Sequence, residues 1–136
     1  MTVANDNFTE ADLIELERSV SSLVAICHKM NAHWWIDPST GEDLRKNPLI
    51  VPTKLMLTVS ELAEAMEAHR KDLMDDKLPH RLGIEAELVD VLIRVGDLAG
   101  ALGLNLGPTA REKSAFNLVR PDHKAENRVT KGGKKY

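Results

Sequence analysis

Two stretches of this chain decide its fold: TKLMLTVSELAEAMEAHR, residues 53–70, and RLGIEAELVDVLIRVGDLAGAL, residues 81–102. In both, apolar side chains recur at steps of three and four, which is the period of an α-helix. They cover two faces of each helix rather than one, and one of those faces also carries acids. A helix that is apolar nearly all round belongs in a protein interior. The stretches therefore predict two buried helices, 53–74 and 81–102, the second closed by Gly103 as C-cap.

Two further helices are predicted on either side of this pair. Thr9 reads as the cap of a helix that ends near the tryptophans, with the Asp12 side chain reaching back to it. Turn-forming residues and Pro48 and Pro52 keep the next segment irregular. The last helix, 109–119, stops before Pro121. We expect an all-α fold, a four-helix bundle assembled by oligomerisation, because one protomer offers more apolar helix surface than it can cover alone.

The composition supports a helical protein without a membrane segment. Hydrophobic residues make up 43% of the chain and aromatic residues only 4%, which favours helices over sheets. No stretch approaches the roughly 18 to 20 apolar residues that span a bilayer, and the first ten residues do not resemble a signal peptide. We therefore expect a cytoplasmic protein. The single cysteine, Cys27, sits at helical spacing among apolar residues and is predicted to be core.

The charge is unevenly divided along the chain. Residues 111–136 hold eight Lys or Arg against three acids, a balance of +5, so the net charge of -3 leaves -8 on residues 1–110. An acidic body of this kind can hold divalent cations, and it argues against a nucleic-acid binder. We expect one domain over residues 1–125 and a basic, disordered tail over 126–136.

The acids of the two central helices have matched spacing. Glu61 and Glu64 are three residues apart on the first helix, as Glu87 and Asp90 are on the second. At 100° per residue, each pair projects from one face, so two antiparallel helices can direct all four carboxylates at one point. Buried acids in such number repel one another unless cations neutralise them. Oxygen ligands of this kind suit magnesium or manganese.

Other interpretations of these acids stay open. They could lie on a solvated helix face, or form salt-bridge networks in a non-catalytic helical interaction module. Arg94, one turn after Asp90, could pair with that residue or with Asp97. A di-iron bundle is disfavoured, because neither of the first two acids nor Glu87 is followed by the histidine that such a site needs.

The motifs SELAEAME, residues 60–67, and ELVDVLIR, residues 87–94, resemble the ExxE…ExxD signature of the MazG-like, all-α nucleoside triphosphate pyrophosphohydrolases. A third block is similar to the phosphate-contacting segment of that superfamily, with Lys113, Asn117 and Arg120 at the matching places. The resemblance covers about residues 55–123. The WWID segment, 34–37, and the connection 73–81 look like those of short, phage-encoded members.

The resemblance implies an enzyme and its cofactor. Its members use the four acids to hold Mg²⁺ against a triphosphate, with Mn²⁺ as a substitute. The expected reaction is attack of a metal-activated water on the α-phosphorus, giving a nucleoside monophosphate and pyrophosphate. One of the two glutamates on the helix 53–74 would also orient the water. The resemblance favours dGTP or GTP as substrate, leaves a different or non-canonical dNTP open, and implies a homodimer or homotetramer.

Further side chains are candidates for binding the substrate. Cations would surround the phosphates, and the candidates are Lys54, Lys71, Arg81, Lys113 and Arg120, with Asn117 beside them. Trp34 and Trp35 could stack on a base, although core or dimer packing is an equal alternative for them. Asn31 nearby could read a base edge, as could His33 and Asp37.

Overall fold

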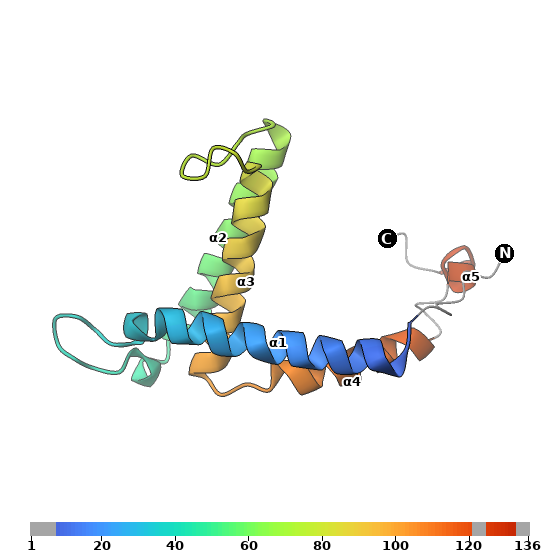
Figure 1. Cartoon of the computed structure of the whole chain (residues 1–136), viewed down its shortest axis with the longest axis horizontal. Coiled ribbons are helices and arrows are strands. Elements are labelled where there is room, and N and C mark those ends of the chain that lie inside the picture. Colours follow the sequence, from blue (N-terminus) through green and yellow to red (C-terminus); the bar gives the residue numbers. More distant parts are fainter. Residues whose placement is uncertain (1–7, 121–124, 133–136) are drawn as a thin grey trace. The chain divides into compact units, whose positions relative to one another are not determined.

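The computed structural model describes residues 8–120 and 125–132, and within these ranges it contains helices and no strand (Figure 1). The predicted all-α class is thus confirmed. The α-helices are α1 (Glu10–Asn31), α2 (Ile50–Arg70), α3 (Gly83–Ala101), α4 (Leu106–Val119) and the short α5 (Ala125–Arg128). Two 3₁₀ turns, η1 (Ala32–Trp35) and η2 (Leu44–Lys46), lie between α1 and α2. The segment predicted as a disordered tail thus includes most of α5, and residues 133–136 lie outside the described part.

The described chain divides into two compact units, and the division falls within α1. One unit runs from Ser22 to Leu104 and holds η1, η2, α2 and α3 with the second half of α1. The other combines the chain up to Ser21 with the chain from Asn105 onward, including α4. The acids at matched spacing all belong to the first unit.

The start of α1 follows the sequence prediction. The Thr9 backbone N–H donates to Asp12 Oδ2 at 2.7 Å, and the Asp12 backbone N–H donates to the Thr9 hydroxyl at 3.3 Å. This reciprocal pair satisfies donors that the first helical turn would otherwise leave free. Within the same unit, Arg111 of α4 pairs with Glu17 of α1 at 3.1 Å and also with Glu10.

The ends of α2 differ from the prediction. The helix begins at Ile50 rather than Thr53, because Pro52 lies in the first turn, where a missing N–H removes no helical hydrogen bond. It ends at Arg70 rather than Met74. Asp72 adopts a left-handed conformation (φ 51°), and the Leu73 N–H closes the helix on the Ala68 carbonyl at 2.9 Å. The same first-turn rule lets α4 begin at Leu106 rather than Thr109, with Pro108 inside it.

The end of α3 confirms the predicted C-cap. Gly103 has φ 65°, a conformation that favours glycine, and the next N–H, of Leu104, bonds to the Ala99 carbonyl at 2.9 Å. Two other glycines let α3 approach α1 closely. A Cβ on Gly96 would lie 2.9 Å from the Cys27 Cβ, and one on Gly100 would lie 2.3 Å from the His28 Cβ.

The core of the Ser22–Leu104 unit forms where η1, α2 and α3 meet. Trp35, Leu98 and Ala101 are buried together, and Ile50 packs against them. Cys27 is also buried, as predicted. Figure 1 shows α2 and α3 side by side along their length.

A second apolar surface of this helix pair is not covered by the described residues of the Ser22–Leu104 unit. We call it the apolar face, and its residues are 38% to 58% exposed: Leu55, Val59, Leu62 and Met66 on α2, with Leu88, Leu92 and Val95 on α3. This is the surface that the sequence marked as a second apolar side of each helix. Its exposure shows that the described residues of this unit bury only one of the two sides of the pair.

Candidate functional site

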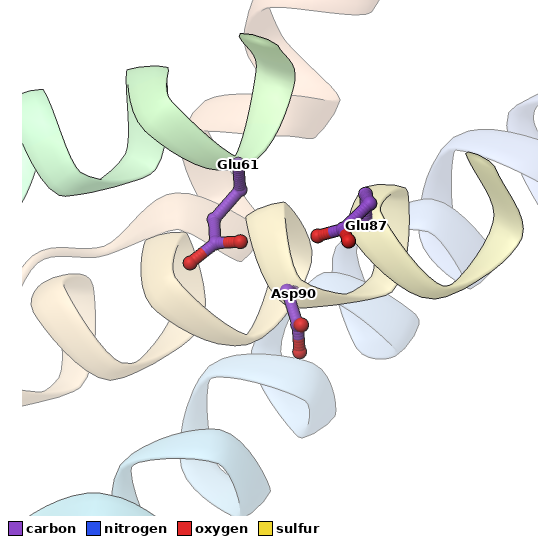
Figure 2. A group of neighbouring side chains, drawn as sticks. All are labelled: Glu61, Glu87 and Asp90. Carbon is purple, nitrogen blue, oxygen red and sulfur yellow. The ribbon is translucent and has the colours of Figure 1, made fainter. Parts of the chain in front are cut away.

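Three acids from the facing sides of α2 and α3 come together. One oxygen each of Glu61, Glu87 and Asp90 lies within 4.8 Å of the others, and Figure 2 shows the three side chains converging from two helices. We call them the carboxylate triad. The spacing of three residues places Glu87 and Asp90 on one side of α3, and the buried Ala65 and Ala68 mark the side of α2 that carries Glu61 and packs on α3.

The triad combines a buried acid with more open ones. Glu61 is 8% exposed, Glu87 is half-buried and Asp90 is exposed. Arg94 of α3 binds Glu61, with both Nε and Nη2 at 2.6 Å from Oε1. The pairing of Arg94 with Asp90 or Asp97 that the sequence suggested is therefore wrong, because the cross-helix partner lies closer. Both bonds to Arg94 use Oε1 of Glu61.

Crowding of the acids changes their acidity. The pKa of Glu87 is raised from 4.5 to about 7, mainly by burial, and further by the charge of Glu64, by a hydrogen bond and charge from Glu61, and by the charge of Asp90. Burial and the charge of Glu61 also raise the pKa of Asp90, against the effect of Arg94. The mutual repulsion of these acids would be relieved by a positive charge placed among them.

Glu64 is placed differently from the other three predicted acids. It is exposed and is not one of the three acids whose oxygens meet, although its charge acts on Glu87. Within the described residues it makes no hydrogen bond or ion pair. Asp75, which the sequence analysis assigned only to a connection, adds its charge to Asp90. The side chain of Asp75 accepts the Lys77 and Leu78 N–H groups, which fixes this loop beside α3.

A cleft of about 430 Å³ opens beside the triad, within the range typical of ligand pockets. We call it the site cleft. Its lining joins two triad acids to cations, an amide and an aromatic ring: Asn31, Trp34, Lys54, Glu61, Asp90, Ile93, Arg94 and Asp97. Three predicted substrate-binding residues, Asn31, Trp34 and Lys54, thus lie in one cleft with the acids. Ile93 and Asp97 were missed, because their spacing alone does not distinguish them from ordinary helix positions.

The two tryptophans have separate roles. Trp34 is 61% exposed, and its ring lies 4.5 Å from the His33 ring, centroid to centroid. Trp35 is 2% exposed, and its indole N–H donates to both carboxylate oxygens of Asp97 at 3.0 Å. Base stacking by Trp35 is therefore wrong, since its ring is in the core, and only Trp34 keeps an open face for a base.

Of the remaining predicted cations, two belong to the same unit as the site without lining the cleft, and two belong to the other unit. Lys71 pairs with Glu67 at 2.5 Å, and Arg81 is exposed in the loop between α2 and α3. Lys113 and Asn117 lie on α4, and Arg120 is the C-cap residue that follows it, all in the other unit, where both cations lie 5.6 Å from the Phe116 ring centroid. The end of this third block, from Pro121, falls outside the described residues.

The chain was compared with family models, with curated proteins and with solved structures. None of them matches. Among the described helices, none is both long enough and apolar enough to cross a membrane.

The donor set of the triad fits a metal ion. Three carboxylates can each offer one oxygen to a common point, and two of them have raised pKa values, so they gain most from a neighbouring positive charge. Carboxylate oxygens are hard ligands, which suit hard divalent cations. The carboxylate triad, anchored by the buried Glu61, could therefore bind a metal ion.

The raised pKa of Glu87 leads to a prediction for the metal-free protein. Because its folded pKa, about 7, lies above the ordinary 4.5, the carboxyl favours the folded state below about pH 4.5 and loses this contribution as the pH rises to about 7. We expect the melting temperature of Glu87→Gln to exceed that of the parent by a difference that grows as the pH of the buffer rises from about 5 to about 8. Thermal melting in chelator measures this difference, and magnesium should abolish it. A constant difference across this range would contradict the crowding of the acids.

Proposed function

We propose that this protein is a Mg²⁺-dependent nucleoside triphosphate pyrophosphohydrolase that releases a nucleoside monophosphate and pyrophosphate, with dGTP or GTP as the preferred substrate. The observation that carries the proposal is the meeting of Glu61, Glu87 and Asp90 beside a cleft, which two of these acids line together with two cations and an exposed tryptophan. The resemblance of these acids to the ExxE…ExxD signature supplies the reaction class and the guanine preference. An enzyme of nucleotide pools would work in the cytoplasm.

The proposed hydrolysis divides the work among the chain's own residues. The triad would hold the cation, which lowers the pKa of water and neutralises phosphate charge when bound. Water attacks the α-phosphorus, a new oxygen–phosphorus bond forms, and the bond to the β-phosphate breaks as pyrophosphate leaves. A glutamate of α2 would orient the water and accept its proton, and Glu64, which is exposed and whose charge acts on Glu87, is our candidate.

The other residues of the cleft suit the rest of a nucleotide. Lys54 and Arg94 supply positive charge for the phosphates. Trp34 presents an exposed ring on which a base can stack, with His33 beside it. The Asn31 side-chain amide donates to the Cys27 carbonyl at 2.9 Å, which leaves its oxygen for a base or sugar group.

One observation favours a second candidate, a non-catalytic helical interaction module. Arg94 joins α3 to α2 through the largely buried Glu61, as expected for a structural ion pair between helices. In that case the cleft would be a by-product of packing. The raised pKa of Glu87 argues against it, because a salt-bridge network would lower the pKa values of its acids.

We also propose that a second copy of this chain covers the apolar face. The face extends over both α2 and α3, so two copies related by a twofold axis would meet as a bundle of four helices. Its seven half-exposed residues are aliphatic or methionine, the composition of a helix–helix seam. A homodimer, or a homotetramer built from two such pairs, satisfies this arrangement.

The test of the proposed activity is a panel of common dNTPs and NTPs with magnesium and with chelator. We expect pyrophosphate and monophosphate as products, fastest for a guanine nucleotide, and no turnover in excess chelator. Manganese should restore turnover. Release of single phosphates would contradict attack at the α-phosphorus. Full turnover in chelator would contradict a metal-dependent reaction and would indicate that the triad is structural.

A further inference from the structure

The indole N–H of Trp35 is hydrogen-bonded to a buried acid, Asp97. Its indole N–H lies 3.0 Å from both oxygens of Asp97, and Asp97 is itself 7% exposed. Nδ1 of His28 lies 2.9 Å from one of the same oxygens. Asp97 of α3 therefore orients the Trp35 ring of η1, and His28 of α1 holds Asp97 in turn.

Lys54 lies over that ring. Its ammonium nitrogen is 4.8 Å from the Trp35 ring centroid, and it reaches there from α2. Lys54 and Glu61 are seven residues apart, so they share one side of α2, about 10 Å apart along its axis. In the described part of the chain Lys54 forms no ion pair, although Glu61 and Asp90 line the same cleft.

The contact with an aromatic ring has a chemical consequence that an ion pair would not have. A carboxylate neutralises an ammonium, whereas a ring face attracts it and leaves its charge and N–H groups available to an anion. Hydrogen bonding of the indole N–H to the Asp97 carboxylate adds electron density to the ring. The arrangement therefore holds a full positive charge at a defined place in the cleft.

We infer that Trp35, oriented by Asp97 and His28, is a positioning residue that holds Lys54 to bind the pyrophosphate portion of the substrate. The inference rests on the proposed function for the identity of the substrate. It assigns Trp35 a function through Lys54 rather than through contact with the base. The binding of a polyphosphate by Lys54 is a property that can be measured without any hydrolysis.

The experiment uses inorganic pyrophosphate as the probe and Trp35 as the reporter. The chain has two tryptophans, so Trp34→Phe leaves Trp35 as the only indole. We expect pyrophosphate to change Trp35 emission saturably, because the bound anion partly neutralises the charge that Lys54 holds over the ring. Adding Lys54→Met should abolish this signal and weaken calorimetric binding at least about tenfold, the value of a modest charge-assisted hydrogen bond. Lys54→Arg should retain both, and Lys46→Met, an exposed lysine outside the cleft, should change neither.

Trp35 and Asp97 are then tested for action through Lys54. Asp97→Asn and Trp35→Phe, which keeps a ring but removes the N–H, should weaken pyrophosphate binding several-fold and raise KM more than they lower kcat. Neither should weaken binding further in a Lys54→Met background. Equal losses with and without Lys54 in folded protein would overturn the positioning role, as would unchanged binding in Lys54→Met. Pyrophosphate binding that depends on Lys54 in a protein that cleaves no nucleotide would refute the proposed function and leave this inference standing.

Discussion

Replacing Asp90 by Asn or Glu87 by Gln is expected to lower turnover at least about 100-fold, because even residues that only support a metal ligand contribute 10- to 100-fold. The same variants should be as stable as the parent in chelator, or more stable, because each removes a charge from a crowded group of acids. Magnesium should raise the melting temperature of the parent and leave these variants nearly unchanged. Turnover assays and thermal melting, each with and without magnesium, measure both effects.

Glu61 is expected to behave differently. Glu61→Gln removes the partner of Arg94, so it should destabilise the metal-free protein while it also abolishes turnover. The cost should fall below the about 3 to 5 kcal/mol of a fully buried pair, because Arg94 is 36% exposed. Asp76→Asn, in the exposed loop, is the matched control and should change neither property. Destabilisation by all three triad variants without metal, with turnover intact per folded molecule, would establish the interaction module instead.

The second large effect concerns the apolar face. Leu62→Glu combined with Leu92→Glu should convert the protein from a dimer or tetramer to a monomer, as measured by light scattering after size exclusion. In one chain these side chains are 47% and 49% exposed, so the charges cost little there, but in an interface they would be buried without partners. Ile14→Glu, equally exposed on α1, should leave the assembly intact. A parent protein that is monomeric at micromolar concentration would contradict the proposal that a second copy covers the apolar face.

Much of the fold can be predicted from local signals. The capping pair of Thr9 and Asp12 and the left-handed Gly103 are encoded within a few residues, and the structure has both. Pro52 was misleading because its effect depends on its place in the helix, which the sequence does not state. The end of α2 was missed because Asp72 takes a conformation that is uncommon outside glycine.

The site was predicted less completely, because its chemistry depends on contacts across helices. Periodicity identified the four acids, but it could not show that Glu61 is buried against Arg94 while Glu64 stays exposed. Nor could it assign Trp35 to the core, since its partner Asp97 lies 62 residues along the chain. The spacing of residues predicts which side chains share one face of a helix. Which side chains of a neighbouring helix contact that face depends on how the helices pack.

The close approach of α1 to α3 at Gly96 and Gly100 also constrains which sequence changes the cleft can tolerate. His28 reaches Asp97 because neither glycine has a side chain to separate the helices. A single methyl group at Gly100 would overlap the His28 Cβ and move α1 outward, which would withdraw His28 from Asp97. The two glycines thus set the distance between the axes of α1 and α3. The geometry of the cleft depends on this distance as much as on the charged groups that line it.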